Sequence, residues 1–153
     1  MDIFEQYFDK QLDYSYYKYR EGDWYSKGID SLVINKTTDS YYVYELLEIE
    51  QDDFLYFPIL DKEGNKHRFV TSEADYIFYF KQFGEKLYSG EPAVIRQRIK
   101  DIWQGEDAKY KDLPLAELSN GSKYIPLPAE EFEDIFNTYE ISKPVLHLLK
   151  NFQ

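Results

Sequence analysis

The stretch YYVYELLEIEQDDFLYFPIL (residues 41–60), with DYIFYFKQF (75–83) after it, holds most of the residues from which a core can be built. Aromatic side chains make up 19% of the 153-residue chain, with 16 Tyr and 11 Phe, and they are densest here. Such residues favour strands because they pack well on a pleated surface. We therefore expect this stretch to be the scaffold of a single domain, residues 1–153, onto which the rest packs.

Alternating patterns predict strands in and just before this stretch. Residues 31–35 form a short run rich in β-branched side chains. In 41–50 one face of the strand is mainly apolar, and the other is apolar at its start and acidic at its end. Residues 54–60 are apolar on both faces. Pro58 lacks an N–H, which moves the 54–60 strand to a sheet edge or a bulge. Residues 61–65 predict a hairpin loop into a strand at 67–70. The result is an antiparallel meander of three to five strands, with Tyr42 and Tyr44 exposed.

Two segments beside the meander have helical spacing. Residues 2–12 carry an amphipathic pattern of apolar side chains. Residues 71–84 fit a helix or a strand, because their aromatic density suits a strand while their end signals suit a helix. We favour the helix, since Ser72 with Asp75 resembles a capping box and Gly84 suits a helix end.

The C-terminal half has clearer helical signals. Pro92 suits a first helical position, and an apolar stripe runs from there to Gly105. Arg96, Arg98 and Lys100 form a basic cluster on this segment. Residues 106–127 indicate an irregular connection, and further helices are predicted at 128–139 and from 142 onwards. The predicted fold class is therefore α+β, an antiparallel meander packed against helices, with a mainly helical C-terminal half.

The composition limits the classes of protein to which the chain can belong. The absence of cysteine excludes a disulfide framework, thiolate catalysis and thiolate metal sites. The acidic N-terminus lacks the basic flank and apolar run of a signal peptide, and no apolar run approaches membrane-spanning length. We expect a cytoplasmic protein of a bacterium or a phage, without a membrane partner.

The formal net charge of −11 bears on the partners. Repulsion disfavours direct binding to nucleic acid or to anionic lipid. The charge suits a basic protein partner, although solubility alone also explains an acidic surface.

Motifs that carry chemistry are absent from the sequence. His67 and His147 have no His or Cys neighbour at metal-ligand spacing, and each is more readily a structural or surface residue than a catalytic one. There is no glycine-rich phosphate loop, no GxSxG elbow and no EF-hand spacing. We predict no catalytic residue, no metal and no cofactor, so an enzyme is the less favoured interpretation.

Residues 13–25 (DYSYYKYREGDWY) concentrate the Tyr, Trp and Arg side chains that are common at interface hot spots. The alternative is a pair of strand-like segments whose rings lie along a sheet. Acids of the 128–139 segment add a charged face. The predicted partner-binding residues are Tyr14, Tyr16, Tyr17, Tyr19, Arg20, Trp24, Tyr25, Tyr42, Tyr44, Glu130, Glu131 and Asp134.

Three functions fit these features. The first is a non-enzymatic immunity or inhibitor protein that neutralises a basic partner such as a toxin. The second is a nucleic-acid mimic that inhibits a DNA-handling enzyme, with Glu130–Asp134, Asp101, Glu106 and Asp107 as its carboxylate track. The third is a small-ligand binder or enzyme whose pocket is lined by Tyr rings between sheet and helices.

Overall fold

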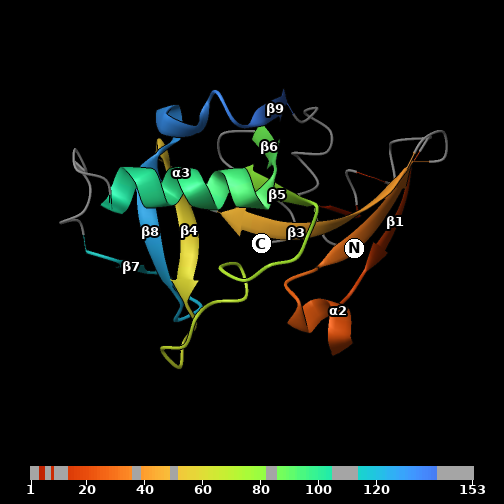
Figure 1. The fold of residues 1–153 in the computed structure, drawn as a ribbon, viewed down its shortest axis with the longest axis horizontal. Coiled ribbons are helices and arrows are strands. Elements are labelled where there is room, and N and C mark those ends of the chain that lie inside the picture. Colours follow the sequence, from red (N-terminus) through yellow and green to blue (C-terminus); the bar gives the residue numbers. More distant parts are fainter. Residues whose placement is uncertain are drawn as a thin grey trace.

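The computed structural model of the chain describes residues 4, 5, 8, 14–35, 39–48, 52–81, 86–104 and 114–140. Strands dominate the described residues, in two sheets with helix α3 beside them (Figure 1). Sheet A has six strands in the order β1-β2-β3-β5-β6-β9: β1 Tyr14–Lys18, β2 Ser31–Asn35, β3 Ser40–Glu48, β5 Tyr76–Lys81, β6 Lys86–Gly90 and β9 Asn137–Glu140. Sheet B has three in the order β4-β8-β7: β4 Phe54–Leu60, β8 Lys123–Pro128 and β7 Ala116–Glu117.

The helical elements are short apart from one. Helix α2 spans Gly22–Ser26, α3 spans Pro92–Gln104, and a 3-10 turn, η1, spans Ala129–Phe132. The predicted α+β meander with a mainly helical C-terminal half is therefore wrong. The protein is mostly β, and its C-terminal half contains β7, β8 and β9.

The predicted strands at 31–35, 41–50 and 54–60 exist as β2, β3 and β4, but they do not form one meander. The chain leaves sheet A after β3, forms β4 in sheet B, and returns so that β5 lies parallel to β3. Strand β4 is an edge strand, and its register shifts between Pro58 and Leu60, as the missing proline N–H predicts. Residues 67–70 form turns rather than a strand, and only an isolated bridge joins Leu60 to Lys66.

The predicted helix at 71–84 is wrong: Tyr76–Lys81 form β5, which is buried on both sides, and residues 82–84 lie outside the described residues. Ile77 and Tyr79 point into one core cluster, while Phe78 and Phe80 point into the other. A strand places successive side chains on opposite faces, so it buries all four. β5 thus lies inside sheet A between β3 and β6, where its aromatic side chains pack into a core cluster on each face of the sheet.

The C-terminal segments also differ from the prediction. In place of a helix over 128–139, the 3-10 turn η1 buries Phe132, Phe136 is buried after the turn that follows, and the chain then pairs with β6 as β9. The predicted irregular connection contains β7 and β8. Pro126 and Pro128 are accommodated because β7 pairs only with the first two residues of β8, so both prolines lie beyond it.

Other predictions hold or fall outside the described residues. The helix opened by Pro92 is confirmed as α3. Within 2–12, residues 4, 5 and 8 are helical and the remainder lies outside the described residues, as does everything from 141 onwards, including His147. Residues 13–25 supply β1 and α2.

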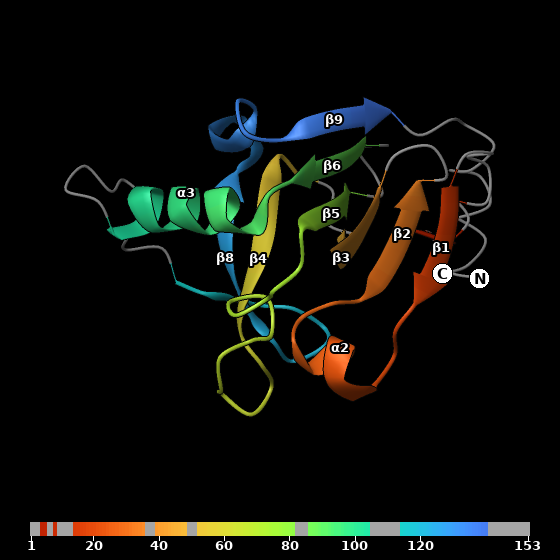
Figure 2. The same cartoon turned by 45° about the vertical axis from the view of Figure 1, so that its right-hand side comes forward.

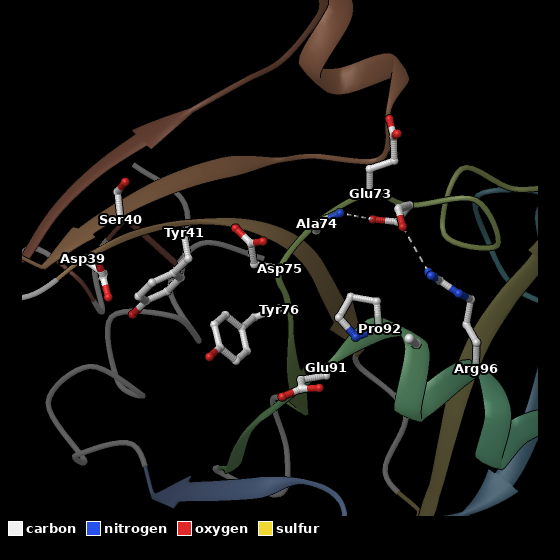
Figure 3. A pocket seen from close by; sticks show the side chains of 12 residues that line it. Asp39, Ser40, Tyr41, Glu73, Ala74, Asp75, Tyr76, Glu91, Pro92 and Arg96 are labelled. Carbon is white, nitrogen blue, oxygen red and sulfur yellow. Dashed lines mark hydrogen bonds between the residues drawn. The ribbon is translucent and has the colours of Figure 1, made fainter.

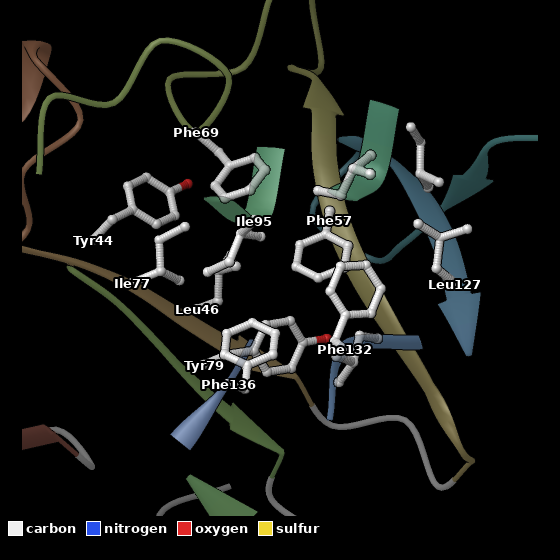
Figure 4. Close-up of a cluster of buried hydrophobic side chains, with 13 residues drawn as sticks. Tyr44, Leu46, Phe57, Phe69, Ile77, Tyr79, Ile95, Leu127, Phe132 and Phe136 are labelled. Atoms are coloured by element: carbon white, nitrogen blue, oxygen red, sulfur yellow. The ribbon is translucent and has the colours of Figure 1, made fainter. Parts of the chain in front are cut away.

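Two apolar clusters lie on opposite faces of sheet A. The larger one fills the space between sheet A, sheet B and α3, with Phe57, Phe69, Tyr79 and Phe132 among its members (Figure 4). The smaller one packs Phe8 against β1, β2, β3, β5 and β6. α3 and sheet B lie over the part of the sheet that contains β5 and β6, whereas β1 and β2 extend beyond them (Figure 2).

Candidate functional site

An open hollow of about 590 Å³ lies where three elements begin. It lies at the start of β3, the start of β5 and the first turn of α3 (Figure 3). We call it the acidic hollow. The residues that line it are Asp39, Ser40, Tyr41, Ser72, Glu73, Ala74, Asp75, Tyr76, Glu91, Pro92, Ala93 and Arg96.

The parallel pairing of β3 with β5 creates this hollow. Strand β5 begins with Tyr76 opposite Val43, so Asp39, Ser40 and Tyr41 extend past the beginning of β5. The amino end of α3 closes the far side. Residues that are distant in sequence therefore meet at one edge of the sheet.

Four carboxylates make the hollow strongly acidic. Within the described residues, Asp39, Glu73, Asp75 and Glu91 form no ion pair. Asp75 is positioned by the backbone N–H of Tyr42, which donates to its Oδ2 at 2.8 Å. Exposed carboxylates that lack an internal cation are free to bind an external one.

The one cation of the lining, Arg96, is directed elsewhere. Its guanidinium donates to the carbonyl oxygens of Ser72 at 3.2 Å and of Phe69 at 3.4 Å, and not to a carboxylate. Burial lowers the pKa of Arg96. Arg96 thus holds the 69–72 loop against α3 and does not pair with the four carboxylates.

Two tyrosine rings form the floor beside these acids. Tyr41 and Tyr76 meet edge to face with ring centroids 5.1 Å apart, and Tyr76 is 37% exposed. An ammonium or guanidinium group is attracted both to aromatic rings and to carboxylates. Together, the rings and the acids suit a lysine or arginine side chain better than an anion or an apolar group.

A second surface feature is an aromatic stack on the other side of the 73–75 segment, which we call the Trp24 stack. Trp24, from α2, lies against Tyr42 with ring centroids 4.7 Å apart and planes at 19°, and Tyr19 lies 6.3 Å from Trp24. The Lys27 ammonium lies over the indole, 5.3 Å from the ring centroid, and Trp24 remains 40% exposed. The backbone N–H of Glu73 donates to the carbonyl of Lys27, which fixes α2 beside the hollow.

The structure therefore brings together three of the predicted partner-binding residues, Tyr19, Trp24 and Tyr42, and separates the others. Tyr14 and Tyr16 are half-buried against Phe8. Tyr17 is exposed on β1, and Arg20 pairs with Glu5 at 3.6 Å.

Tyr25 and Tyr44 belong to a polar network, in which Tyr25 stays 37% exposed while Tyr44 is buried. The Tyr25 ring covers the Arg68 guanidinium at 3.6 Å, and Arg68 pairs with Asp30 at 2.8 Å. Tyr44 is only 2% exposed, so its predicted exposure is wrong. Burial raises its pKa well above the ordinary value.

His67 joins the same network. Its Nδ1 accepts the N–H of Phe69 at 3.2 Å and lies 3.3 Å from the Tyr44 hydroxyl. Burial, followed by the charge of Arg68, lowers the pKa of His67, which favours the neutral ring. This histidine holds a turn in place.

The predicted acidic residues of the C-terminal segment lie apart from the hollow, on η1 and the turn after it. Asp134 forms a bidentate ion pair with Arg98, in which the two guanidinium N–H groups donate to the two carboxylate oxygens at 2.7 and 2.8 Å. Arg98 also donates to the carbonyl of Glu131. Glu130 is exposed on η1. Asp101 accepts from Gln97 within α3, while Glu106 and Asp107 lie outside the described residues.

Sequence reasoning missed the four carboxylates of the hollow. Asp39, Asp75 and Glu91 each come just before or at the start of an element, but no motif connects them. Their proximity follows from the β3–β5 pairing, which the predicted helix at 71–84 excluded.

Comparison with protein-family models, with curated proteins and with solved structures finds no match for this chain. None of the helices in the described ranges is long and apolar enough to cross a membrane. The described side chains also contain no group of three or more acids and histidines arranged to hold a metal ion. The function must therefore be argued from the hollow and its surroundings.

Proposed function

We propose that this protein binds and neutralises a basic partner protein, as an immunity or inhibitor protein does, and that the acidic hollow receives lysine or arginine side chains of that partner. The observation that carries the proposal is the placement around the Tyr41–Tyr76 pair of four carboxylates that form no ion pair with any described residue. A cation that enters would gain charge-assisted hydrogen bonds and ring contacts together.

The charge of the whole chain supports the same function. A net charge of −11 attracts a basic protein from a distance and so raises the rate of association. The hollow then supplies the short-range contacts that select an exposed basic side chain. A nuclease-type toxin fits this description, because its own surface must be basic to bind nucleic acid.

The test is capture of a partner from the source cells with a tagged chain, followed by kinetics with the purified partner. The variant Asp39→Asn/Glu73→Gln/Glu91→Gln removes three charges from the hollow. The control Glu63→Gln/Glu117→Gln/Glu133→Gln removes three charges from exposed positions elsewhere. We expect the hollow variant to bind about tenfold or more weakly than the control, because close charge pairs contribute more than remote ones.

Two results would contradict the proposal. One is equal binding by the two triple variants, which would mean that only the total charge matters. The other is an association rate that does not fall as NaCl is raised, because steering between opposite charges is screened by salt.

A second candidate function is favoured by the size of the hollow. About 590 Å³ falls within the range of small-molecule sites, so a small organic cation is the alternative occupant. Isothermal titration with spermidine tests it. Binding that the hollow variant loses and the control variant keeps would support this candidate, and absence of heat with the unmodified protein would remove it.

A further inference from the structure

One face of the N-terminal half of sheet A carries aromatic side chains that the core does not use. Tyr17, Leu32 and Tyr42 lie in one row across β1, β2 and β3, because Tyr17 pairs with Leu32 and Leu32 pairs with Tyr42. Side chains in one row point to the same face. The neighbouring residues Tyr16, Val33 and Tyr41 point to the opposite face, where Phe8 packs.

Helix α3 and sheet B do not reach this row. Both lie over the β5 and β6 side of the sheet, and α2 lies at the end of the β1–β2 side (Figures 1 and 2). Tyr17 is accordingly 56% exposed and Leu32 only partly buried. We call Tyr17, Tyr19, Trp24, Leu32 and Tyr42 the Trp24 face.

The stack at the end of this face is held in place without contributing to the core. Helix α2 contains no buried residue. Its backbone is nevertheless fixed, since the N–H of Ile29 donates to the carbonyl of Trp24 at 3.0 Å, and the indole lies on Tyr42. A rigid, half-exposed aromatic group loses little entropy on binding and is typical of an interface anchor.

The charges around the Trp24 face select the kind of occupant. Glu21, Asp23, Glu73 and Asp75 are exposed in the segments that flank it, together with Arg20 and with Lys27 over the indole, so acids outnumber bases there by four to two. Asp75 lines the acidic hollow and also accepts the backbone N–H of Tyr42, so the hollow adjoins the strand that carries Tyr42. A second copy of this chain would bring the same acids together, which repulsion disfavours.

We infer that the Trp24 face is the apolar half of the partner-binding surface, and that it takes an extended segment of the basic partner in which apolar side chains alternate with arginine or lysine. This inference rests on the proposed function. It assigns an anchoring role to Trp24 and a steering role to the carboxylates of the hollow.

The two tryptophans provide a direct assay with the full chain. Trp24 reports on the Trp24 face, while Trp103, partly buried on α3 against the larger core cluster, is the internal reference. The indole N–H signals are followed by NMR during titration with three eight-residue peptides, of alternating arginine and leucine, arginine and serine, and aspartate and leucine. We expect the arginine–leucine peptide to shift the Trp24 signal alone, and the other two to bind about tenfold or more weakly.

Variants separate the inference from the proposed function. Trp24→Ala should weaken the arginine–leucine peptide about tenfold or more, mainly by faster dissociation. The control Leu47→Ala removes a 55% exposed apolar side chain from the opposite face of β3 and should leave binding unchanged. The triple variant of the hollow should instead slow association and reduce its dependence on salt.

Several results would overturn the inference. If both arginine peptides bind equally and only the hollow variant weakens them, the proposed function stands and the Trp24 face has no part in it. If the aspartate–leucine peptide binds as well as the arginine–leucine peptide, the face does not select a basic partner. If no peptide containing arginine binds, both proposals fail. If the Trp24 signal moves with protein concentration alone, a second copy is the occupant.

Discussion

Gly28 shows how a single position can depend on the absence of a side chain. It has φ +75°, and a Cβ added there would lie 2.6 Å from Cα of Ser72 and 2.8 Å from the carbonyl oxygen of Arg68. The Ser72 hydroxyl donates to the Gly28 carbonyl at 2.6 Å, so the two segments are tied closely. This contact connects the end of α2 to the loop that lines the acidic hollow.

We therefore predict that Gly28→Ala lowers the free energy of unfolding by about 3 kcal/mol or more, from the left-handed backbone and the overlap together. The control is Gly64→Ala, where φ is +85° and nothing lies within 4 Å of the added Cβ. That change should cost about 1–2 kcal/mol, the backbone contribution alone. Urea denaturation measures both, and equal losses would show that the close approach at Gly28 does not matter.

Asp52 gives a prediction for the dependence of stability on pH. Burial alone would raise its pKa, but hydrogen bonds from Tyr56 at 2.5 Å and from Lys81 at 3.0 Å outweigh burial and lower the pKa below its ordinary value. A lowered carboxyl pKa adds stability above the unfolded-state value, about 3.9, and this stability is lost as the pH falls through the folded-state value.

We accordingly expect Asp52→Asn to be less stable than the unmodified protein at pH 7, with the difference shrinking as the pH falls below about 4. Tyr56→Phe removes one of the three hydrogen bonds that Asp52 accepts, the third being from the backbone N–H of Phe54, and should show a smaller difference of the same sign. Urea denaturation at a series of pH values tests this. A gap that stays constant from pH 7 to pH 2 would contradict the assignment.

At the scale of elements, α3 shows how one buried stripe fixes a helix on a sheet. Ile95 is fully buried in the larger core cluster, while its neighbour Val94 is exposed. Ile95→Ala should lower the free energy of unfolding by about 2–5 kcal/mol. Val94→Ala should change it by no more than about 0.5 kcal/mol. Thermal and urea denaturation would detect the contrast, and similar losses at both positions would mean that α3 packs by a different face.

Elements with a local cause were predictable from the sequence. α3 follows from Pro92 and a helical stripe, and β2, β3 and β4 follow from alternation and β-branched residues. β5 was not predictable in this way, because Tyr76 and Phe80 are four residues apart and so also fit a helix. What makes it a strand is that apolar surfaces lie on both sides of the sheet, which is a property of the assembled molecule.

The same limit applies to the 128–139 segment. Phe132 and Phe136 have helical spacing, and the 3-10 turn that ends at Phe132 with the turn after it is enough to bury both. The following residues then pair with the edge of β6 and form β9. Competition from an available sheet edge cannot be read from the segment itself.

For the whole molecule, net charge is the property that the sequence gives directly. At −11 the folded chain repels itself, and compaction raises that repulsion. We expect the free energy of unfolding in urea to rise as NaCl is increased from about 0.01 M to about 0.15 M, over which the screening length falls from about 30 Å to about 8 Å. A fall over this range would show that salt weakens attractive pairs, such as Arg98 with Asp134, more than it relieves repulsion.

The location of the acidic hollow is also a property of the whole molecule. Its carboxylates come from the starts of β3, β5 and α3, and only the parallel pairing brings them together. The Trp24 stack was easier to anticipate, since Tyr19 and Trp24 both lie in the aromatic 13–25 segment. Its third member, Tyr42, joins from β3.

The parallel pairing at the centre of sheet A also bears on how the chain folds. Glu48 and Lys81 are paired in register but are 33 residues apart along the chain, and β4 lies between them. Pairings of such separation form slowly because the loop must close first, whereas β2 and β3 are joined by a short connection. We expect pulse-labelling hydrogen exchange to show amides of β2 protected before those of β5. Because the acidic hollow needs both β3 and β5, it would then be among the last features to form, and simultaneous protection of the two strands would rule this order out.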